Sequence, residues 1–126
     1  MSGRILVIED DSGIRAMLAR GLGVAAYAMT EAPDLATGRS LWTSGAFDVV
    51  LLDVMLPDGN GLELVAERRA AGDGTPVVVL SAREETELRE RAATAGATAY
   101  LPKPFAYAEL LACLAALAPA DRRAGG

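Results

Sequence analysis

The sequence predicts an α/β fold, a three-layer sandwich in which helices cover both faces of a parallel sheet. Aliphatic runs without polar alternation indicate strands that are buried on both faces. Longer segments with apolar residues at helical spacing separate these runs, so strand and helix alternate five times. A chain of 126 residues is long enough for one domain with its own core and too short for two.

Five strands are predicted, and four of them are near-continuous apolar runs. They occupy residues 5–8, 27–31, 49–52, 77–80 and 98–101. The second strand alternates apolar and polar residues, which is expected nearer an edge of the sheet. Right-handed crossovers between parallel strands favour the flavodoxin-like order 2-1-3-4-5, in which the first and third strands are neighbours and the switch point lies between them.

Five helices are predicted between and after the strands. They occupy residues 12–22, 35–45, 62–72, 84–95 and 107–117, with ends that are approximate. Asp11 or Ser12 is expected to cap the first helix and Asp34 the second. Gly21 and Gly23 are expected to end the first helix, and Gly96 to follow the fourth.

The apolar residues of the last three helices indicate what each helix buries. The third is expected to bury Leu62, Val65 and Ala66, whereas the fourth is mostly charged and has only Leu88 and alanines for packing. The fifth carries four leucines, more than one stripe needs to cover the sheet: Leu110, Leu111, Leu114 and Leu117. Apolar surface is therefore expected to remain beside the fifth strand, and such a patch is typical of an interface.

Composition excludes several function classes. The net charge is −5, so the domain by itself is a poor nucleic-acid binder. The absence of histidine excludes a histidine-based catalytic triad and the usual zinc sites. Cys113 is the only cysteine, which rules out an intrachain disulfide, and it is interpreted as a small apolar residue of a helix. No apolar stretch is long enough for a membrane span, and the cytoplasm is the expected compartment.

Acidic residues follow two of the predicted strands. Glu9 and Asp10 end the first strand and Asp53 ends the third. Since ligands of an open parallel sheet bind beyond the carboxyl ends of its strands, these carboxylates are expected to meet. Carboxylates that crowd together repel one another, and a divalent cation relieves the repulsion. Their oxygens suit Mg²⁺, so the sequence predicts a magnesium site.

A hydroxyl and an ammonium group follow the other two buried runs. Ser81 comes after the fourth strand and Lys103 after the fifth, between Pro102 and Pro104. Opposite a carboxylate–metal centre, a hydrogen-bond donor and a positive charge suit a phosphoryl group. There is no phosphate-binding loop or dinucleotide fingerprint, so a carboxylate is expected to accept the phosphate covalently. An X-Pro bond in such a tight loop is where a cis peptide is found.

Four segments together resemble the receiver domain of two-component response regulators. They read ILVIEDD (5–11), LLDVMLPDGNG (51–61), VVVLSAR (77–83) and GATAYLPKPF (96–105), and their spacing also fits that family. Within the family, the chain is most similar to receivers of winged-helix transcription regulators. The resemblance implies a receiver domain over residues 1–118 and a linker or tail over residues 119–126.

The resemblance also implies residue roles. Asp53 is the phosphoacceptor, and Asp10, Asp53 and the main-chain carbonyl of Met55 bind Mg²⁺, with Glu9 acting through water. Ser81 binds a phosphoryl oxygen, and Lys103 pairs with the phosphate. The remaining roles are a cis peptide at Pro104 and an aromatic switch at Tyr100, which moves when Ser81 is drawn toward the phosphate.

A dimer face is implied by the same resemblance, formed by the fourth helix, the fifth strand and the fifth helix. The residues placed on it are Arg89, Glu109, Leu110 and Cys113. Relatives usually have two acids where this chain has Thr98 and Ala99, and an arginine at position 113. The charge-paired dimer is therefore expected to be weakened, with apolar contact dominating.

The function predicted from these features is a phosphorylation switch. A sensor histidine kinase is the expected phosphoryl source, and DNA is reached only through a separate output domain. Such a domain supports its own phosphorylation and slow autodephosphorylation without being a classical enzyme. The alternatives are a single-domain phosphorelay receiver, a receiver that binds a partner without phosphorylation, and a Mg²⁺-dependent aspartyl-phosphate phosphohydrolase. The last needs a second acid two residues after Asp53, where this chain has Met55.

Overall fold

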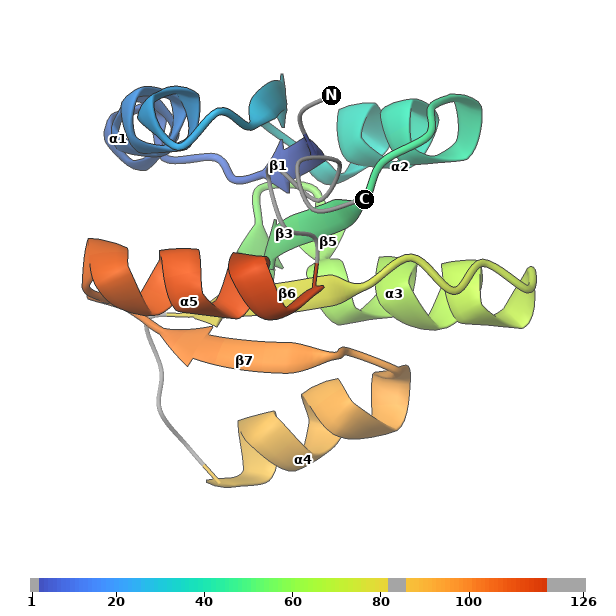
Figure 1. Cartoon of the computed structure of the whole chain (residues 1–126). Helices are drawn as coiled ribbons and strands as arrows, with labels where there is room; N and C mark the ends of the chain where they lie inside the picture. The colour runs from blue at the N-terminus through green and yellow to red at the C-terminus, as the bar shows by residue number, and fades with distance from the viewer. Residues whose placement is uncertain (1–2, 82–85, 118–126) are drawn as a thin grey trace.

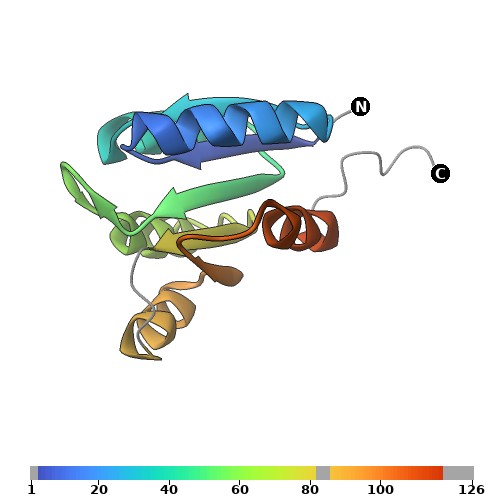
Figure 2. The ribbon, with the colours of Figure 1, turned by 90° about the vertical axis from the view of Figure 1, so that its left-hand side faces the viewer.

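The computed structural model describes residues 3–81 and 86–117. Within them a five-stranded sheet has the order β2-β1-β3-β6-β7, and every neighbouring pair is parallel. The strands are β1 (Arg4–Ile8), β2 (Ala28–Ala32), β3 (Val49–Asp53), β6 (Val77–Ser81) and β7 (Ala99–Pro102). Because β6 and β7 are the fourth and fifth predicted strands, the flavodoxin-like order is confirmed. Figure 2 shows β1 and β3 pointing the same way.

Helices cover both faces of this sheet, as predicted. They are α1 (Ser12–Val24), α2 (Leu35–Ser44), α3 (Gly61–Ala70), α4 (Thr86–Ala95) and α5 (Tyr107–Leu117). Side chains of α1 and α5 pack in one apolar cluster, and side chains of α2, α3 and α4 pack in the other. The sheet separates the two clusters, which gives three layers (Figure 1).

The three inner strands supply the centre of the core. Every residue of β3 and β6 is buried, as are four of the five residues of β1. Successive side chains point to opposite faces, so Ile5 and Val7 pack with α1 and α5, whereas Leu6 and Ile8 pack with α2 and α3. Burial on both faces explains why these strands are continuous aliphatic runs.

Helix caps confirm part of the prediction and correct another part. The Asp11 carboxylate accepts a hydrogen bond from the Ile14 amide at 2.9 Å and caps α1. The prediction that Gly21 and Gly23 end α1 is wrong, because the helix continues to Val24 and its cap is Ala25. Leu18 and Leu22 are buried against the sheet, so packing holds the helical backbone through both glycines.

The buried residues of α3 and the start of β2 also differ from the prediction. In α3 it is Leu64, fully buried, and not the exposed Ala66, that joins Leu62 and Val65 in the core. Ala66 falls outside the one face of α3 that carries its buried residues, which are Gly61, Leu62, Leu64 and Val65. Tyr27 is buried but precedes β2 instead of starting it. The predicted start of the fourth helix at residue 84 and the predicted tail at 119–126 lie outside the described residues.

A small hairpin follows Asp53 that the sequence did not indicate. It consists of β4 (Met55–Leu56) and β5 (Gly59–Asn60), paired antiparallel. At its turn, the Asp58 carboxylate accepts hydrogen bonds from the amides of Leu35 at 2.7 Å and Ala36 at 3.0 Å. These two bonds lower the pKa of Asp58 below its usual value. The hairpin is thereby tied to the start of α2 (Figure 2).

Gly61 closes the other end of this hairpin, and we expect it to tolerate no side chain. A Cβ at this position would overlap the carbonyl oxygen of Asp53 and approach Cγ of Leu52 to 3.1 Å. Gly61→Ala must therefore displace backbone next to Asp53, at a cost of about 1–3 kcal/mol of unfolding free energy. Urea unfolding followed by circular dichroism measures this.

Gly23→Ala is the matched control. Gly23 lies within α1, and no atom lies within 4 Å of the position that its Cβ would take. Because alanine favours helix, we expect this variant to gain up to about 1 kcal/mol. Equal stability of the two alanine variants would contradict the steric argument at Gly61.

Candidate functional site

Three carboxylates meet at the carboxyl edge of the sheet. Glu9 and Asp10 follow β1, and Asp53 is the last residue of β3 beside it. One oxygen of each carboxylate lies within 4.8 Å of the others. Glu9 is fully buried and Asp53 is 8% exposed, whereas Asp10 faces solvent. The predicted acidic cluster is therefore present, and its charges are close enough to repel strongly.

Lys103 reaches this cluster from the end of β7. Its Nζ lies 2.6 Å from Oε1 of Glu9 and 3.2 Å from Oδ2 of Asp53. Burial lowers the pKa of Lys103, but the hydrogen bond to Glu9 and the charges of Asp53 and Glu9 outweigh that effect and leave the pKa above its usual value. The ammonium group therefore stays charged and offsets part of the negative charge.

Main-chain groups hold the acids in place. The Asp11 amide donates to Oε2 of Glu9 at 3.1 Å, and the Met55 amide donates to Oδ1 of Asp53 at 3.2 Å. Arg15 in α1 donates from Nη1 to the Glu9 carbonyl oxygen at 2.8 Å. The carboxylates of Glu9 and Asp53 are thus oriented by the backbone that follows their strands.

Ser81 and the loop after β7 lie at the same edge. Ser81, the last residue of β6, is 3% exposed. Its carbonyl oxygen accepts a hydrogen bond of 2.6 Å from the Lys103 amide, which ties the end of β6 to the loop after β7. The Lys103–Pro104 peptide bond is cis.

This arrangement suits a hard cation and a phosphoryl group. Carboxylate oxygens are ligands of Mg²⁺, so the donor chemistry of Glu9, Asp10 and Asp53 fits that ion. A buried carboxylate beside an ammonium group and a hydroxyl also suits covalent attachment of phosphate.

Comparison with known families decides what kind of domain this is. Residues 5–115 match the model of the response regulator receiver domain, which spans β1 to α5 and includes each residue of the acidic cluster and Lys103. The chain belongs to this family. It is a receiver domain of a two-component response regulator.

Curated relatives agree with this assignment. The receiver domain is 43% identical over 117 residues to the response regulator MprA of Mycobacterium tuberculosis strain H37Rv, and 44% identical over 117 residues to MprA of Mycolicibacterium vanbaalenii. These matches cover 93% of this chain and 51% of each relative. The chain therefore spans about half the length of the curated relatives it matches.

Solved structures have the same fold. The receiver domain of the Francisella response regulator 1452 matches with a TM-score of 0.88 and 30% identity, over 91% of this chain and 95% of that one. The chemotaxis protein CheY4 of Vibrio cholerae matches with a TM-score of 0.86 and 28% identity, over 93% of this chain and 99% of that one.

Two residues predicted for the switch and the interface lie together on one side of the receiver domain. The guanidinium carbon of Arg89 in α4 lies 4.5 Å from the centre of the Tyr100 ring in β7. Tyr100 is half-buried against the cluster formed with α2, α3 and α4, whereas Arg89 is exposed. The sequence named both residues but did not indicate that they touch.

The predicted dimer face needs one correction. Leu110 is 1% exposed and packs in the core, because α5 turns Leu110 and Leu114 toward the sheet. Cys113 is half-buried against the same cluster, and burial raises the pKa of its thiol. Glu109 is exposed but accepts a hydrogen bond of 2.9 Å from the Ala106 amide at the start of α5.

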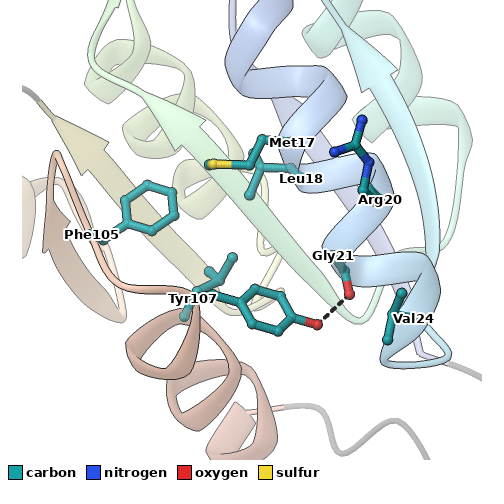
Figure 3. Close-up of a pocket in the computed structure, with 8 residues that line it drawn as sticks. Met17, Leu18, Arg20, Gly21, Val24, Phe105 and Tyr107 are labelled. Carbon is teal, nitrogen blue, oxygen red and sulfur yellow. Dashed lines mark hydrogen bonds between the residues drawn. The ribbon is translucent and has the colours of Figure 1, made fainter.

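Exposed apolar surface lies elsewhere, in a groove between α1 and α5 of about 290 Å³. Met17, Val24 and Tyr107 line it and are three of the four large apolar side chains that are exposed among the described residues. Figure 3 shows the Tyr107 hydroxyl donating to the carbonyl oxygen of Gly21 across the groove. Of the α5 leucines that were expected to leave apolar surface beside the fifth strand, Leu110 and Leu114 are buried, whereas Leu111 and Leu117 are half-buried.

Sequence reasoning missed Arg15, which holds the Glu9 carbonyl from outside the site, and Asp58, which ties the hairpin to α2. Arg15 pairs with Glu31 of β2 at 3.1 Å and so fixes the guanidinium that holds the Glu9 carbonyl. Asp58 acts on residues 23 positions earlier in the chain. No local sequence pattern identifies contact partners that lie so far apart in the chain. The available signal was the presence of charged residues next to the motifs.

Proposed function

We propose that this receiver domain accepts a phosphoryl group on Asp53 from a phosphohistidine of a sensor kinase. The observation that supports this most directly is the 3.2 Å contact between Asp53 and Lys103, inside a cluster that also contains Glu9 and Asp10. A carboxylate that is the nucleophile needs nearby positive charge to approach an anionic phosphoryl group.

In the proposed reaction, an Asp53 carboxylate oxygen forms a bond to phosphorus while the phosphorus–nitrogen bond of the phosphohistidine breaks. Lys103 neutralises charge on the transferring group, and Ser81 donates a hydrogen bond to one of its oxygens. The imidazole leaves with the electron pair of the broken bond. Ser81 then moves toward the phosphate, and Tyr100 follows toward the space that is vacated.

The experiment is incubation of the domain with a small-molecule phosphodonor and Mg²⁺, followed by intact-mass spectrometry over time. We expect one phosphoryl group per chain that persists and then hydrolyses slowly. Rapid turnover of donor would favour the aspartyl-phosphate phosphohydrolase, and absence of labelling would favour a receiver that acts without phosphorylation.

Asp10, Asp53 and the Met55 carbonyl are the proposed ligands of Mg²⁺, with Glu9 acting through water. When bound, Mg²⁺ supplies the positive charge that stabilises an anionic phosphoryl group next to carboxylates. The two-residue step from Asp53 to Met55 lies at the start of the hairpin, where the Met55 amide already contacts Asp53.

We expect Asp10→Asn to weaken Mg²⁺ binding by about tenfold or more, because it removes a charged ligand. It should also stabilise the metal-free fold, since one repulsive charge is lost. Isothermal titration calorimetry and thermal unfolding measure the two effects. Asp11→Asn is the control, because Asp11 caps α1 and asparagine caps equally well. Equal metal affinity of the Asp10 and Asp11 variants would place the ion elsewhere.

The output is proposed to be transcription, through a DNA-binding domain joined at the predicted linker of residues 119–126. Two observations support this proposal. The matched relatives are about twice as long as the matched segment, and the acidic domain is by itself a poor nucleic-acid binder. We also propose a cytoplasmic compartment, which agrees with the proposed kinase partner. Among the described residues, no helix has the length and apolar character that crossing a membrane requires.

We further propose a weak homodimer through the face formed by α4, β7 and α5, strengthened when Asp53 is phosphorylated. Arg89 and Glu109 are exposed charges on this face. Each exposed bridge between two copies contributes only about 0–1 kcal/mol. Analytical ultracentrifugation with and without beryllofluoride tests this, and we expect weak association that becomes stronger with the mimic. A monomer at high concentration under both conditions would favour the single-domain phosphorelay receiver.

A further inference from the structure

Helix α4 is the helix that the sheet holds least firmly. Its only fully buried side chain among the described residues is Ala92, with Leu88 and Ala95 half-buried beside it. Alanine removes little apolar area from water, so this packing contributes little stability compared with the leucines of the other helices. Contacts outside this stripe therefore matter for the position of α4.

Contacts between described residues supplement the stripe toward each end of the helix. At the carboxyl end, Arg69 of α3 donates from Nε to the carbonyl oxygen of Gly96 at 3.0 Å. Nearer the amino end, the Arg89 guanidinium lies 4.5 Å from the centre of the Tyr100 ring. The first contact joins α4 to a neighbouring helix, whereas the second joins it to β7.

Tyr100 is also connected to the phosphorylation site through its own strand. It lies three residues before Lys103, whose amide donates to the Ser81 carbonyl at 2.6 Å and whose Nζ contacts Asp53. A shift of the Tyr100 ring would break the stack on Arg89, because attraction of a cation to a ring requires the cation over the ring face.

We infer that Arg89 is a positioning residue for Tyr100, whose stack on the ring holds α4 against β7 in the unphosphorylated state. The inference deepens the proposed function, on which its link to phosphorylation rests. The inference assigns the stack to the unphosphorylated state only, so removal of the stack shifts the equilibrium toward the phosphorylated conformation.

The first test is the affinity for beryllofluoride at saturating Mg²⁺, measured by isothermal titration calorimetry. We expect Arg89→Gln to bind the mimic about two- to fivefold more tightly. This is the change in affinity that corresponds to the free energy of one exposed cation–ring stack. Loss of a positive charge by itself would weaken binding of an anion, which is the opposite direction.

Arg4→Gln is the matched control, because Arg4 stacks on Phe47 at 5.1 Å, at the amino end of β1. Arg4→Gln loses the same positive charge and the same kind of cation–ring contact, and we expect its affinity for beryllofluoride to be unchanged. In a Tyr100→Leu background, Arg89→Gln should have no further effect. Unchanged affinity of Arg89→Gln, or an equal gain in the Tyr100→Leu background, would overturn the inference.

A second measurement separates this inference from the proposed function. Hydrogen exchange of α4 amides without any phosphoryl mimic should become faster in Arg89→Gln and remain unchanged in Arg4→Gln. Unchanged exchange in both variants would overturn the role of Arg89 even if Asp53 is phosphorylated. Faster exchange in Arg89→Gln without mimic binding by the wild type would overturn the link to phosphorylation and the proposed function with it.

Discussion

Phosphoryl labelling is expected to fall to background in Asp53→Asn. The side-chain amide has almost the same shape as the carboxylate, but it has no charge and is a poor nucleophile. Asp53 is 8% exposed at the end of a fully buried strand, so its carboxylate has a fixed position in the cluster. Intact-mass spectrometry after incubation with a small phosphodonor and Mg²⁺ measures the effect.

Asp58→Asn is the control for this result. Asp58 lies in the hairpin that follows Asp53, is exposed, and uses its carboxylate to accept from the amides of Leu35 and Ala36. Since it takes no part in the cluster, we expect normal labelling of this variant. Equal labelling of Asp53→Asn and wild type would assign the phosphoacceptor to another residue.

Lys103→Met is expected to destabilise the metal-free fold by about 3–5 kcal/mol. The variant removes the ammonium group that lies 2.6 Å from the fully buried Glu9 and leaves a charged carboxylate without its cation. Mg²⁺ should restore part of the loss, because it supplies the missing positive charge. Urea unfolding with and without Mg²⁺ measures both effects.

The control for Lys103 is Arg39→Met, which breaks the ion pair between Arg39 and Glu67 on the surface. Both side chains are more than two-fifths exposed, so we expect a loss below about 1 kcal/mol. Equal losses in the two variants would show that Lys103 is no more than a surface charge.

The pH dependence of the Lys103 contribution follows from its raised pKa. Burial opposes this shift, while Glu9 and Asp53 together outweigh it. A group whose pKa is higher in the folded state stabilises fully below its unfolded value of about 10.4, and this stabilisation is lost as pH rises through the folded value. We therefore expect the difference in unfolding free energy between wild type and Lys103→Met to stay level near neutral pH and to shrink only in strongly alkaline solution.

The strands and the strand-end residues could be predicted because their signals are local. Burial on both faces requires apolar residues at every position of a strand, which leaves runs such as 49–52 and 77–80 in the sequence. Parallel strands then bring their carboxyl ends to one edge, so Asp53 and Lys103 could be expected to meet although 50 residues separate them.

Helix surfaces and loop contacts could not be predicted in the same way. Nothing local excludes Leu110 from the surface, because several leucines of α5 share the same spacing and only the rotation of the helix decides which of them is buried. Gly21 and Gly23 are ordinary helix-ending residues, and the packing of Leu22 kept the helix intact beyond them.

By itself, the sequence determined the fold class, the order of the sheet and the acids, hydroxyl and lysine of the candidate site. It could do so because hydrophobic periodicity and the rule for strand ends depend only on neighbouring residues. The tertiary structure alone decided that Asp58 accepts hydrogen bonds from the first amides of α2, that Arg15 holds the Glu9 carbonyl and that Arg89 stacks on Tyr100. Each of these contacts joins two separately folded elements, and its geometry depends on how those elements pack against the sheet.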